Sequence, residues 1–435
     1  MDAAVLAGLV MVVSVLIMLA LGIPIAISIG LGSTISMLFI LPFDVAMSSS
    51  AQRMFTGSDS FPLMAITFFI LAGNIMNNGG IALRLVNCAK VLAGRMPAPL
   101  AQTNILANML FGALSGSGVA AAAAIGGTLG PIEKKEGYDP NFIASVNVAS
   151  APTGMLIPPS NTLIVYSTVA GSVSVSALFI AGYFPGILWG IFCMILVAFI
   201  AKRRGYRSAE SVDFKTGLKT IIIAIPSLLL IVIVIGGILA GIFTATEGSA
   251  IAVCYSLFLS LCYRTINWKQ VKTILLSTAE TTVIVTFMIG VSMIMSWIMS
   301  FTHIPAIVAD TLLGFTHNEY AILFIMNAIL LIVGMAMDPI PAILIFTPIF
   351  LPICVSFGMS PIQFGIIMTM NLCIGTITPP VGPILFTGCR VGGVTIESIF
   401  KHLLPFFTVT VIALLLTTYV PAVSMWLPSV FGLVK

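Results

Sequence analysis

The feature that most constrains the fold is an apolar stretch, 111–161, that glycine and proline interrupt at two points. The first interruption is Ser115-Gly116-Ser117-Gly118, and the second is Pro152-Thr153-Gly154 followed by Pro158-Pro159. The segment 119–130 would form a helix that rises only about 18 Å, against a hydrocarbon core of about 30 Å. The sequence therefore predicts a re-entrant hairpin over 98–130 whose Ser/Gly tip lies at mid-membrane depth.

A hairpin tip at this depth has a further implication. Non-helical backbone is tolerated there only where protein or a watery cavity covers it, because each bare N–H or C=O group costs several kcal/mol in lipid. We therefore expect the tip to line a site.

Composition places the chain among membrane proteins. Of its 435 residues, 59% are hydrophobic and 7% are charged, whereas soluble domains have about 25% charged residues. The chain is predicted to be an all-α polytopic membrane protein, and its first apolar segment is expected to be a retained helix, because no cationic start precedes it.

The basic residues form no single patch, so we expect no nucleic-acid partner. The seven cysteines include no CxxC pair, which favours core packing over metal binding or disulfides.

The apolar segments fall into two sets with the same order. The first set has scaffold helices within 1–97, the hairpin 98–130, a broken helix 141–170 and a span 176–201; the second has scaffold helices 219–299, a hairpin 319–352, a broken helix 361–389 and a last helix 402–431. Ser117 precedes Pro158 by the same distance as Asp338 precedes Pro379. The sequence predicts two inverted repeats, 1–201 and 219–435, joined by the cytoplasmic linker 202–218. Such repeats build the midplane sites of secondary transporters.

The basic residues predict the orientation. Of the 18 Lys and Arg residues, all except Arg53 and Lys435 lie in loops on one side of the predicted membrane. Because cytoplasmic loops are enriched in Lys and Arg, we expect that side to be cytoplasmic and both termini to be periplasmic.

The two interrupted regions predict ion and substrate sites. Unwound helices expose carbonyl oxygens beside Ser and Thr hydroxyls, and half-helix N-termini attract anions. One sodium site is predicted at the first hairpin tip and the break beside it, with residues Ser115, Gly116, Ser117, Pro152, Thr153 and Gly154. Its inverted counterpart would use Gly334, Met337, Asp338, Gly375, Thr376 and Thr378. Substrate would lie between the tips, in contact with Ser117, Asn161 and Asp338.

Packing and capping are the competing interpretations. Ser and Gly in membrane helices commonly allow close packing. Asp338 is a functional candidate because an ionisable side chain at membrane depth is costly, although a helix-capping role competes. Glu247 near an outer span end fits capping as well as function, and Glu280 fits a structural polar contact. The histidines His303, His317 and His402 fall at span edges without ligand spacing, so we expect them at the surface.

Seven motifs, in order, resemble the large membrane subunit of TRAP (tripartite ATP-independent periplasmic) transporters. They are LAGNIMNNGG, SGSGVAAAAAIGG, PIEKKEGY, IPPSN, GIFTATEGSA, GMAMDPIPAILIFTPIFLP and ITPPVGP. The resemblance covers nearly the whole chain. It implies a bacterial inner-membrane importer that couples to sodium and moves its hairpins and broken helices against a scaffold as an elevator. It also implies two partners, a small four-helix membrane subunit and a periplasmic substrate-binding protein.

Departures from the family pattern bear on the substrate. Many members read SGSAVAD where this chain has SGSGVAA, so Gly118 and Ala121 differ and Ala121 removes a carboxylate; similarly, FTPTEA appears as FTATEG. The run SAPTGMLIPPSNTLIVYS is similar to sialic-acid members. The resemblance therefore implies sialic acid (N-acetylneuraminate) as substrate in preference to a C4-dicarboxylate or another organic acid.

Other functions fit less well. A stand-alone divalent-anion/sodium symporter also has paired hairpins, but its usual Ser-Asn-Thr tip signature is absent from SGSG and occurs only at Ser160-Asn161-Thr162. An intramembrane serine protease would need a His or Lys base near Ser117, and no span core is predicted to contain one. A passive channel would need a continuous pore, whereas two closed hairpin tips suit alternating access. We expect a transporter without enzymatic activity or organic cofactor, with Na⁺ as a transported ion.

Overall fold

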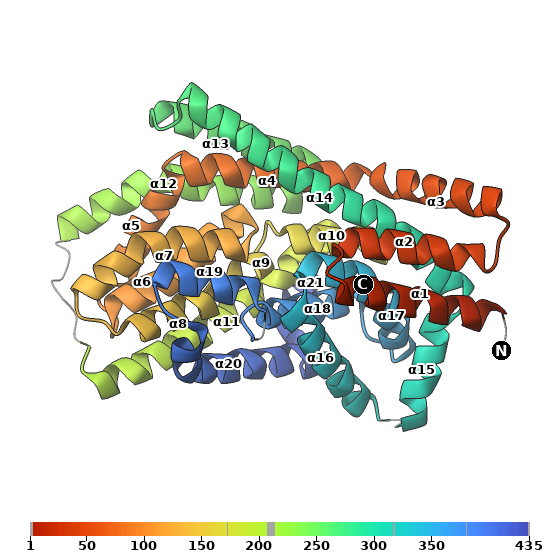
Figure 1. The fold of residues 1–435 in the computed structure, drawn as a ribbon. Coiled ribbons are helices and arrows are strands. Elements are labelled where there is room, and N and C mark those ends of the chain that lie inside the picture. The colour runs from red at the N-terminus through yellow and green to blue at the C-terminus, as the bar shows by residue number, and fades with distance from the viewer. Residues whose placement is uncertain (1–2, 172, 207–213, 316–317, 380, 434–435) are drawn as a thin grey trace.

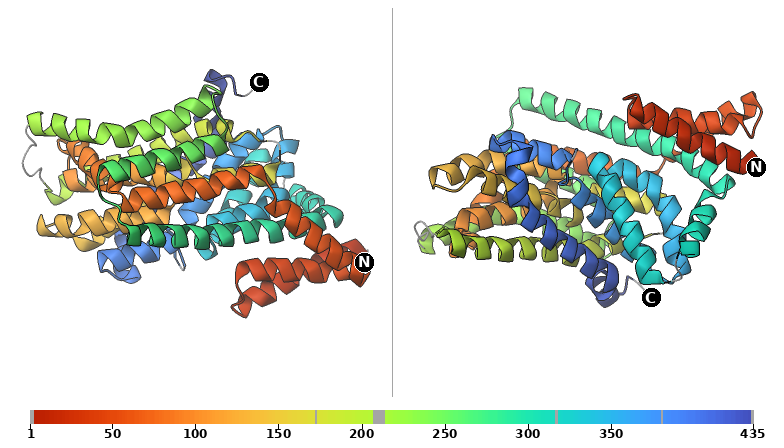
Figure 2. Two further views of the ribbon diagram at one scale, coloured as in Figure 1. Left: turned by 90° about the horizontal axis from the view of Figure 1, so that it is seen from above. Right: turned by 60° about the horizontal axis from the view of Figure 1, so that its bottom comes forward.

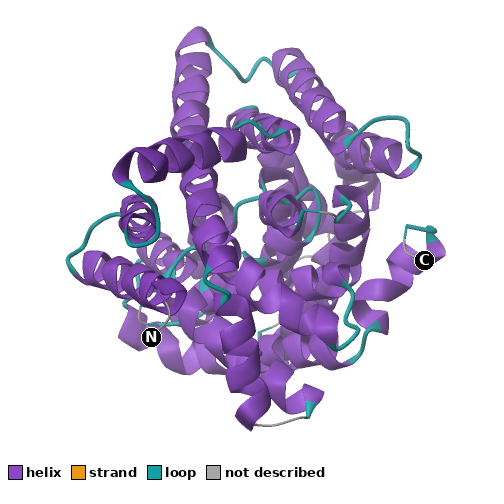
Figure 3. Cartoon of the chain, turned by 90° about the vertical axis from the view of Figure 1, so that its right-hand side faces the viewer, coloured by secondary structure: helices purple, strands orange, loops and turns teal. Residues whose placement is uncertain are grey.

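The described part of the chain is entirely helical. The computed structural model describes residues 3–171, 173–206, 214–315, 318–379 and 381–433, and no strand occurs among them (Figure 3). Eight of the described helices are long and apolar enough to cross a membrane. The predicted all-α polytopic fold is thereby confirmed.

The first half contains a hairpin and a broken helix. The hairpin is formed by α6 (Pro99–Ser115) and α7 (Gly118–Lys135), and the broken helix by α8 (Pro140–Ser150), α9 (Thr153–Leu156) and α10 (Asn161–Ala170). The other helices of this half are α1 (Ala3–Ala20), α2 (Ile25–Leu38), α3 (Phe43–Ser58), α4 (Phe61–Asn78), α5 (Ile81–Ala93) and α11 (Val175–Arg204).

The second half repeats this order. Its hairpin is α16 (Glu319–Ala336) with α17 (Pro339–Ser356), and its broken helix is α18 (Pro361–Gly375) with α19 (Pro383–Gly392). The other helices are α12 (Phe214–Leu239), α13 (Ala245–Cys262), α14 (Trp268–Phe301), α15 (Ile304–Phe315), α20 (Ile396–Tyr419) and α21 (Ala422–Val430).

Helices of one half pack against helices of the other half in equivalent pairs. Helix α7 packs against α19 of the other half, and α17 packs against α10. In the same way α4 packs against α13, and α2 against α14. The hairpins approach the middle of the molecule from opposite ends, α6 and α7 from the left of Figure 1 and α16 and α17 from the right. The two halves are thus related as inverted copies.

A separate group of helices forms the edge of the molecule. Helices α1, α2 and α3 pack beside α14 around a small apolar core that includes Met11, Ile29 and Met295, distinct from the main core. They lie together at one end of the fold in both views of Figure 2. The main core includes Phe111, Tyr166 and Trp189, which are at most 1% exposed and hold the hairpins to the broken helices.

The sequence did not predict three of these helices. Helices α3, α5 and α15 fill segments expected to lie between spans; they are shorter or more polar than a membrane span, and α5 has a clear apolar face that includes Ile81 and Leu85. Helix α7 also runs beyond the expected end of its hairpin arm. Glu133, expected in a charged loop, is therefore only 1% exposed.

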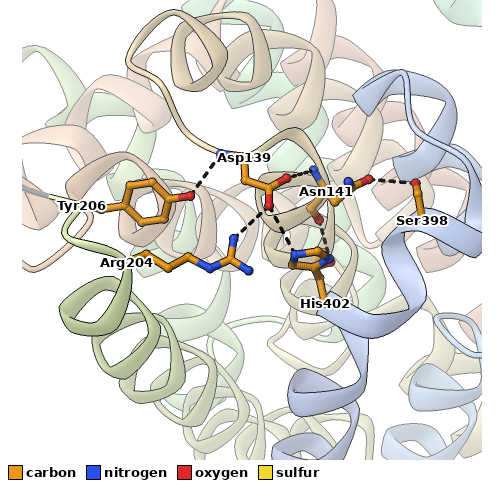
Figure 4. A network of polar contacts seen from close by, with 7 residues as sticks. Asp139, Asn141, Arg204, Tyr206, Ser398 and His402 are labelled. Carbon is orange, nitrogen blue, oxygen red and sulfur yellow. Dashed lines mark hydrogen bonds and ion pairs between the residues drawn. The ribbon is translucent and has the colours of Figure 1, made fainter.

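One polar network joins three helix ends at the base of the first hairpin (Figure 4). Asp139 is the N-cap of α8: its Oδ1 accepts the Asn141 N–H at 2.9 Å, and its Oδ2 lies 2.9 Å from Arg204 Nη1 and 3.3 Å from His402 Nε2. Partial burial alone would raise the pKa of the Asp139 carboxyl, but the hydrogen bonds from Asn141 and Arg204 and the nearby positive charge hold that pKa below its ordinary value. This carboxylate ties α8 to the end of α11 and the start of α20.

We predict that Asp139→Asn keeps the cap but removes the ion pairs, lowering the free energy of unfolding by at most about 1 kcal/mol because the pair is partly exposed. Asp139→Ala should lose about 1 kcal/mol more, because the cap is also removed. The contribution of a lowered carboxyl pKa is present above the ordinary value of 3.8 and disappears as pH falls through the folded-state pKa. Thermal unfolding of the purified protein should therefore show the difference between native protein and Asp139→Asn closing below that value; a difference independent of pH would contradict the assignment.

Candidate functional site

The two hairpin tips meet in one central cavity of about 590 Å³. Its walls come from the tips, from the starts of α10 and α19, and from the faces of α4 and α14. Of the residues predicted as site residues, Ser115, Gly116, Ser117, Asn161, Asp338 and Thr376 line it. All three residues that the sequence assigned to substrate thus lie at one cavity.

The first tip is a glycine turn followed by a capped helix. Gly116 has φ +62°, a left-handed conformation that glycine adopts readily, and its N–H donates to the Gly112 carbonyl at 2.8 Å. The Ser117 hydroxyl then accepts the N–H of Ala120 at 3.3 Å and caps α7. The tip ends α6 and begins α7 within two residues, and the N–H groups of Gly118 and Val119 have no acceptor among the described residues.

Asp338 occupies the equivalent place in the second tip. It is the N-cap of α17, and its Oδ1 accepts the N–H of Ile340 at 3.3 Å. The side chain is exposed within the cavity wall, and its other oxygen has no partner among the described residues. One carboxylate oxygen of Asp338 therefore caps α17, as the capping interpretation expected. The other is available to the cavity, as the functional interpretation expected.

Each hairpin touches its broken helix through a pair of glycines. A Cβ added at Gly154 would lie 2.1 Å from the Gly112 Cα, and one added at Gly375 would lie 2.4 Å from the Gly334 Cα. Real atoms do not approach so closely, so both contacts are backbone against backbone. These pairs bring each broken helix against the hairpin arm of its own repeat.

The remaining predicted residues lie behind the cavity wall. They are Pro152, Thr153, Gly154, Gly334, Met337, Gly375 and Thr378, none of which is among the described lining residues. The Thr153 hydroxyl donates to the Ser150 carbonyl at 2.6 Å, and the Thr376 and Thr378 hydroxyls donate to carbonyls of α18 at 2.6 and 2.8 Å. Because each of these hydroxyls already donates its hydrogen to a carbonyl, it could bind a cation only through a lone pair of its oxygen.

Asn161 is the most exceptional polar residue of the site. Its side chain begins α10 beside the first tip and is 7% exposed, yet its Oδ1 has no hydrogen-bond partner among the described residues. Its amide nitrogen lies over Gly116, 2.9 Å from where a Cβ would be. A buried amide oxygen without a donor is costly in a folded protein, which supports a contact here with a ligand that offers a hydrogen-bond donor or a cation.

Several residues of the site were missed by sequence reasoning. Asn74, Asn77 and Thr281 line the cavity from α4 and α14; the first two belong to the LAGNIMNNGG motif, whose polar positions were the available signal. A second missed feature is a buried chain of hydrogen bonds from Asn104 through Asn108 to Ser150, with Glu133 at its end. Its residues are separated in sequence, so no local pattern indicated it.

The other ionisable candidates lie away from the cavity. Glu247 forms a capping box with Thr244, its Oε2 accepting the Thr244 N–H at 2.7 Å, and Glu280 is exposed on α14. His303 is exposed, whereas His402 is partly buried against Asp139 and is not a simple surface residue. His317 lies outside the described residues.

Comparison with known proteins identifies the family. The family described as "Tripartite ATP-independent periplasmic transporter, DctM component" matches residues 12–423. The chain belongs to the DctM family. This agrees with the resemblance drawn from the seven motifs, and it places the chain in a family of transporters.

DctM relatives differ in what they carry. The chain is 52% identical to the uncharacterized protein YgiK of Salmonella typhimurium, over 92% of each chain. It is 39% identical to the isethionate TRAP transporter permease protein DctMQ of Oleidesulfovibrio alaskensis, over 89% of this chain and 60% of that longer protein. It is 35% identical to the sialic acid TRAP transporter large permease protein SiaM of Vibrio cholerae, over 90% of this chain and 92% of that protein.

A solved structure shares the DctM fold. The YdaH transporter of Alcanivorax borkumensis aligns with a TM-score of 0.62 at 14% identity, covering 89% of this chain and 88% of that chain. At this identity the similarity concerns the fold alone.

We predict that Gly154→Ala lowers the free energy of unfolding by about 1–3 kcal/mol, because the new methyl group meets backbone that cannot rotate away. Gly130→Ala in α7 is the matched control, since a Cβ there meets nothing within 4 Å, and it should be neutral or stabilising by up to about 1 kcal/mol. Thermal unfolding in detergent measures both. Equal effects of the two substitutions would argue against a backbone contact between hairpin and broken helix.

Proposed function

We propose that this chain is the sodium-coupled membrane permease of a tripartite importer and that it carries an organic carboxylate through the central cavity. The observation that carries the proposal is the meeting of both hairpin tips and the starts of α10 and α19 at a single cavity against α4 and α14. Broken helices and re-entrant tips of inverted repeats are what secondary transporters use to bind substrate and ions near the membrane midplane.

Sodium would bind beside each tip. The first site would use Ser115, Gly116 and Ser117 with the break at 152–154, and the second Met337 and Asp338 with residues of the α18 break. The hydroxyl and carbonyl oxygens there suit a hard cation. No cluster of three or more His, Cys, Asp or Glu side chains occurs in the described residues, so ligands for Na⁺ would come mainly from backbone and hydroxyl groups.

Transport would proceed by movement of the hairpins and broken helices against α4 and α14. Glycine pairs lock each hairpin to its broken helix, whereas the first tip meets α4 through Gly73, where a Cβ would lie 3.1 Å from Ser115 backbone atoms. A contact without a side chain allows one surface to slide past the other. This arrangement supports an elevator movement.

The cavity points to an inward-facing state. Its lining includes exposed residues toward one end of the fold, Asn77 at the end of α4, Ala123 in α7 and Thr281 in α14. The same helices lead to the Lys- and Arg-rich loops, which the positive-inside rule assigns to the cytoplasm. Near the start of α4, Leu63 and Ile66 are buried, and Ile66 is part of the cavity lining. With this orientation both termini lie in the periplasm.

The proposed substrate is sialic acid, supplied by a periplasmic binding protein, and the proposed membrane partner is a small four-helix subunit. The run SAPTGMLIPPSNTLIVYS supports sialic acid, while relatives named for isethionate and C4-dicarboxylates make other organic acids the alternative. The cavity volume of about 590 Å³ falls in the usual range for a ligand of this size.

We predict that proteoliposomes with this chain and the small membrane subunit take up radiolabelled sialic acid only when the binding protein and an inward sodium gradient are both present. Asp338→Ala should reduce uptake at least about tenfold, because it removes the charged acceptor of the second tip. Asp310→Ala on the exposed face of α15 is the control and should have no effect. Uptake without the binding protein would favour a stand-alone symporter instead, and absence of uptake under every condition would reject sialic acid.

We further predict that Gly73→Val blocks uptake by protein that still folds, because the side chain would obstruct the sliding of Ser115 past α4. It should also lower the free energy of unfolding by about 1–3 kcal/mol, because a Cβ at this buried position would lie 3.1 Å from Ser115 backbone atoms. Gly236→Val, on an exposed part of α12 where a Cβ meets nothing within 4 Å, is the control. The measurement is initial uptake rate with unfolding temperature. Normal uptake by Gly73→Val would contradict the elevator boundary at this contact.

A further inference from the structure

A second hollow, of about 300 Å³, lies between the end of α11 and the first half of α20. In the described part of the chain it shares no lining residue with the central cavity. Its apolar wall is formed by Leu196, Phe199 and Ile200 of α11 and Pro405 of α20, with the buried Phe142 of α8. We call this hollow the α11/α20 groove, and the proposed transport path does not use it.

The groove is continuous with surfaces that would face lipid. On α11, Ile191, Ile195 and Phe199 are exposed at intervals of four residues, and on α20 Phe400 and Leu404 are exposed at the same interval. Residues four apart lie on one face of a helix. Both helices are long and apolar enough to cross a membrane. An acyl chain that lies along these faces would therefore reach the apolar wall of the groove.

The rim of the groove is basic. Among the described residues that line it are Arg203 and Arg204, in the last turn of α11, and Lys401 and His402, near the start of α20. These helix ends adjoin Lys- and Arg-rich loops, which the positive-inside rule assigns to the cytoplasm. The rim is therefore at the level of the headgroups of the cytoplasmic leaflet.

Asp139 lies beside the rim, but its charge is already compensated. Its Oδ2 is 2.9 Å from Arg204 Nη1 and 3.3 Å from His402 Nε2, and both side chains point toward this carboxylate in Figure 4. Asp139 is not among the described lining residues. Arg204 therefore belongs to the protein's own ion pair and adds little net charge to the groove.

Arg203 and Lys401 keep their charge for a ligand. The Arg203 guanidinium lies 4.5 Å from the centre of the Phe199 ring, on the apolar wall. Neither Arg203 nor Lys401 forms an ion pair with a described residue, and Glu397, one turn before Lys401 on α20, forms none either. The groove thus combines two uncompensated cations with an apolar wall, one cation on each helix.

We propose that the α11/α20 groove binds an anionic phospholipid of the cytoplasmic leaflet, with its phosphodiester between Arg203 and Lys401 and an acyl chain along α11. Basic pockets between transmembrane helices on the cytoplasmic side bind such headgroups, and the N–H groups of Arg and Lys pair with phosphate oxygens. A zwitterionic lipid fits less well, because its own cation would meet the same two side chains. The site would be the same whichever organic anion the permease carries.

The position of the groove gives the lipid a structural role. Helix α11 packs against α6 of the first hairpin, and α20 packs against α8 of the first broken helix. Because α11 belongs to the first repeat and α20 to the second, a phosphate between Arg203 and Lys401 would join the two repeats. This contact would lie next to the link that Asp139 makes between the same two helices.

The test is lipid binding to the purified full-length chain in detergent, measured by native mass spectrometry. The probes are dioleoylphosphatidylglycerol and dioleoylphosphatidylcholine, which have the same acyl chains and differ in net charge. The first molecule of phosphatidylglycerol should bind at least about tenfold more tightly, because it alone brings a net negative charge to the two cations. An excess of glycerol 3-phosphate should not displace it, because the soluble ester has no acyl chain to bury.

A double variant locates the binding. Arg203→Gln with Lys401→Gln should weaken phosphatidylglycerol binding at least about tenfold and leave phosphatidylcholine binding unchanged, because two cations near the phosphate are lost. Both side chains are exposed, so the variant is expected to fold. Lys269→Gln with Lys272→Gln is the matched control: it removes the same charge from exposed positions at the start of α14, away from the groove. It should leave the binding of both lipids unchanged.

Three results would overturn the lipid site. Equal affinity of the native chain for the two lipids would remove the role of charge, and this comparison needs no variant. Equal weakening by the two double variants would indicate a general attraction to a basic surface. Displacement by glycerol 3-phosphate would assign the groove to a soluble phosphate ester. None of these results bears on sodium-dependent uptake through the central cavity, so the lipid site and the proposed function can fail separately.

Discussion

A helix that stops inside a hydrocarbon layer leaves backbone N–H and C=O groups that lipid cannot satisfy, and the centre of this protein is built around that constraint. Four helices begin at the central cavity and two hairpins turn there. Gly116 closes its turn onto the Gly112 carbonyl, while Ser117, Ser160 and Asp338 each cap the helix that follows. The backbone N–H groups that stay unpaired in the first turns of α7 and α10 belong to residues that line the central cavity. The helix breaks are tolerated because their unpaired backbone groups lie at one cavity and not against lipid.

Glycine contacts decide which parts form rigid units. Gly112 with Gly154, and Gly334 with Gly375, bring backbone against backbone inside each repeat, and a contact this close leaves no room for relative displacement. The contact between Ser115 and Gly73 also lacks a side chain, but it is looser: a Cβ at Gly73 would lie 3.1 Å from Ser115 backbone atoms. At the other end of the first hairpin, Asp139 ties α8 to α11 and α20. Hairpins and broken helices thereby form one body beside the scaffold.

The inverted repeats place equivalent helix N-termini on two sides of the cavity. At a few positions in these N-termini the two repeats carry different residues. Ser117 and Asp338 cap equivalent helices, but one is neutral and the other is a carboxylic acid. Prolines in the first turns of α17 and α19 delete donors that α7 and α10 retain. The packing of α7 on α19 and of α17 on α10 is unaffected, because capping and first-turn residues can change without altering the faces that the helices bury. The two repeats therefore share their helix packing but differ in the charge and in the N–H groups that they present to the cavity.

The sequence by itself determined the class of fold and where the helices break, since arm length against membrane thickness, glycine and proline positions and the spacing from Ser117 to Pro158 are local properties of the chain. It also indicated that Ser117, Asn161 and Asp338 share a site. It did not reveal α3, α5 and α15, whose short or polar stretches resemble loops, nor the burial of Glu133. Only the tertiary structure decided which glycines touch, that Asn74, Asn77 and Thr281 complete the cavity, and which helix N-termini keep free donors. These are contacts between segments far apart in sequence, and no local pattern encodes them.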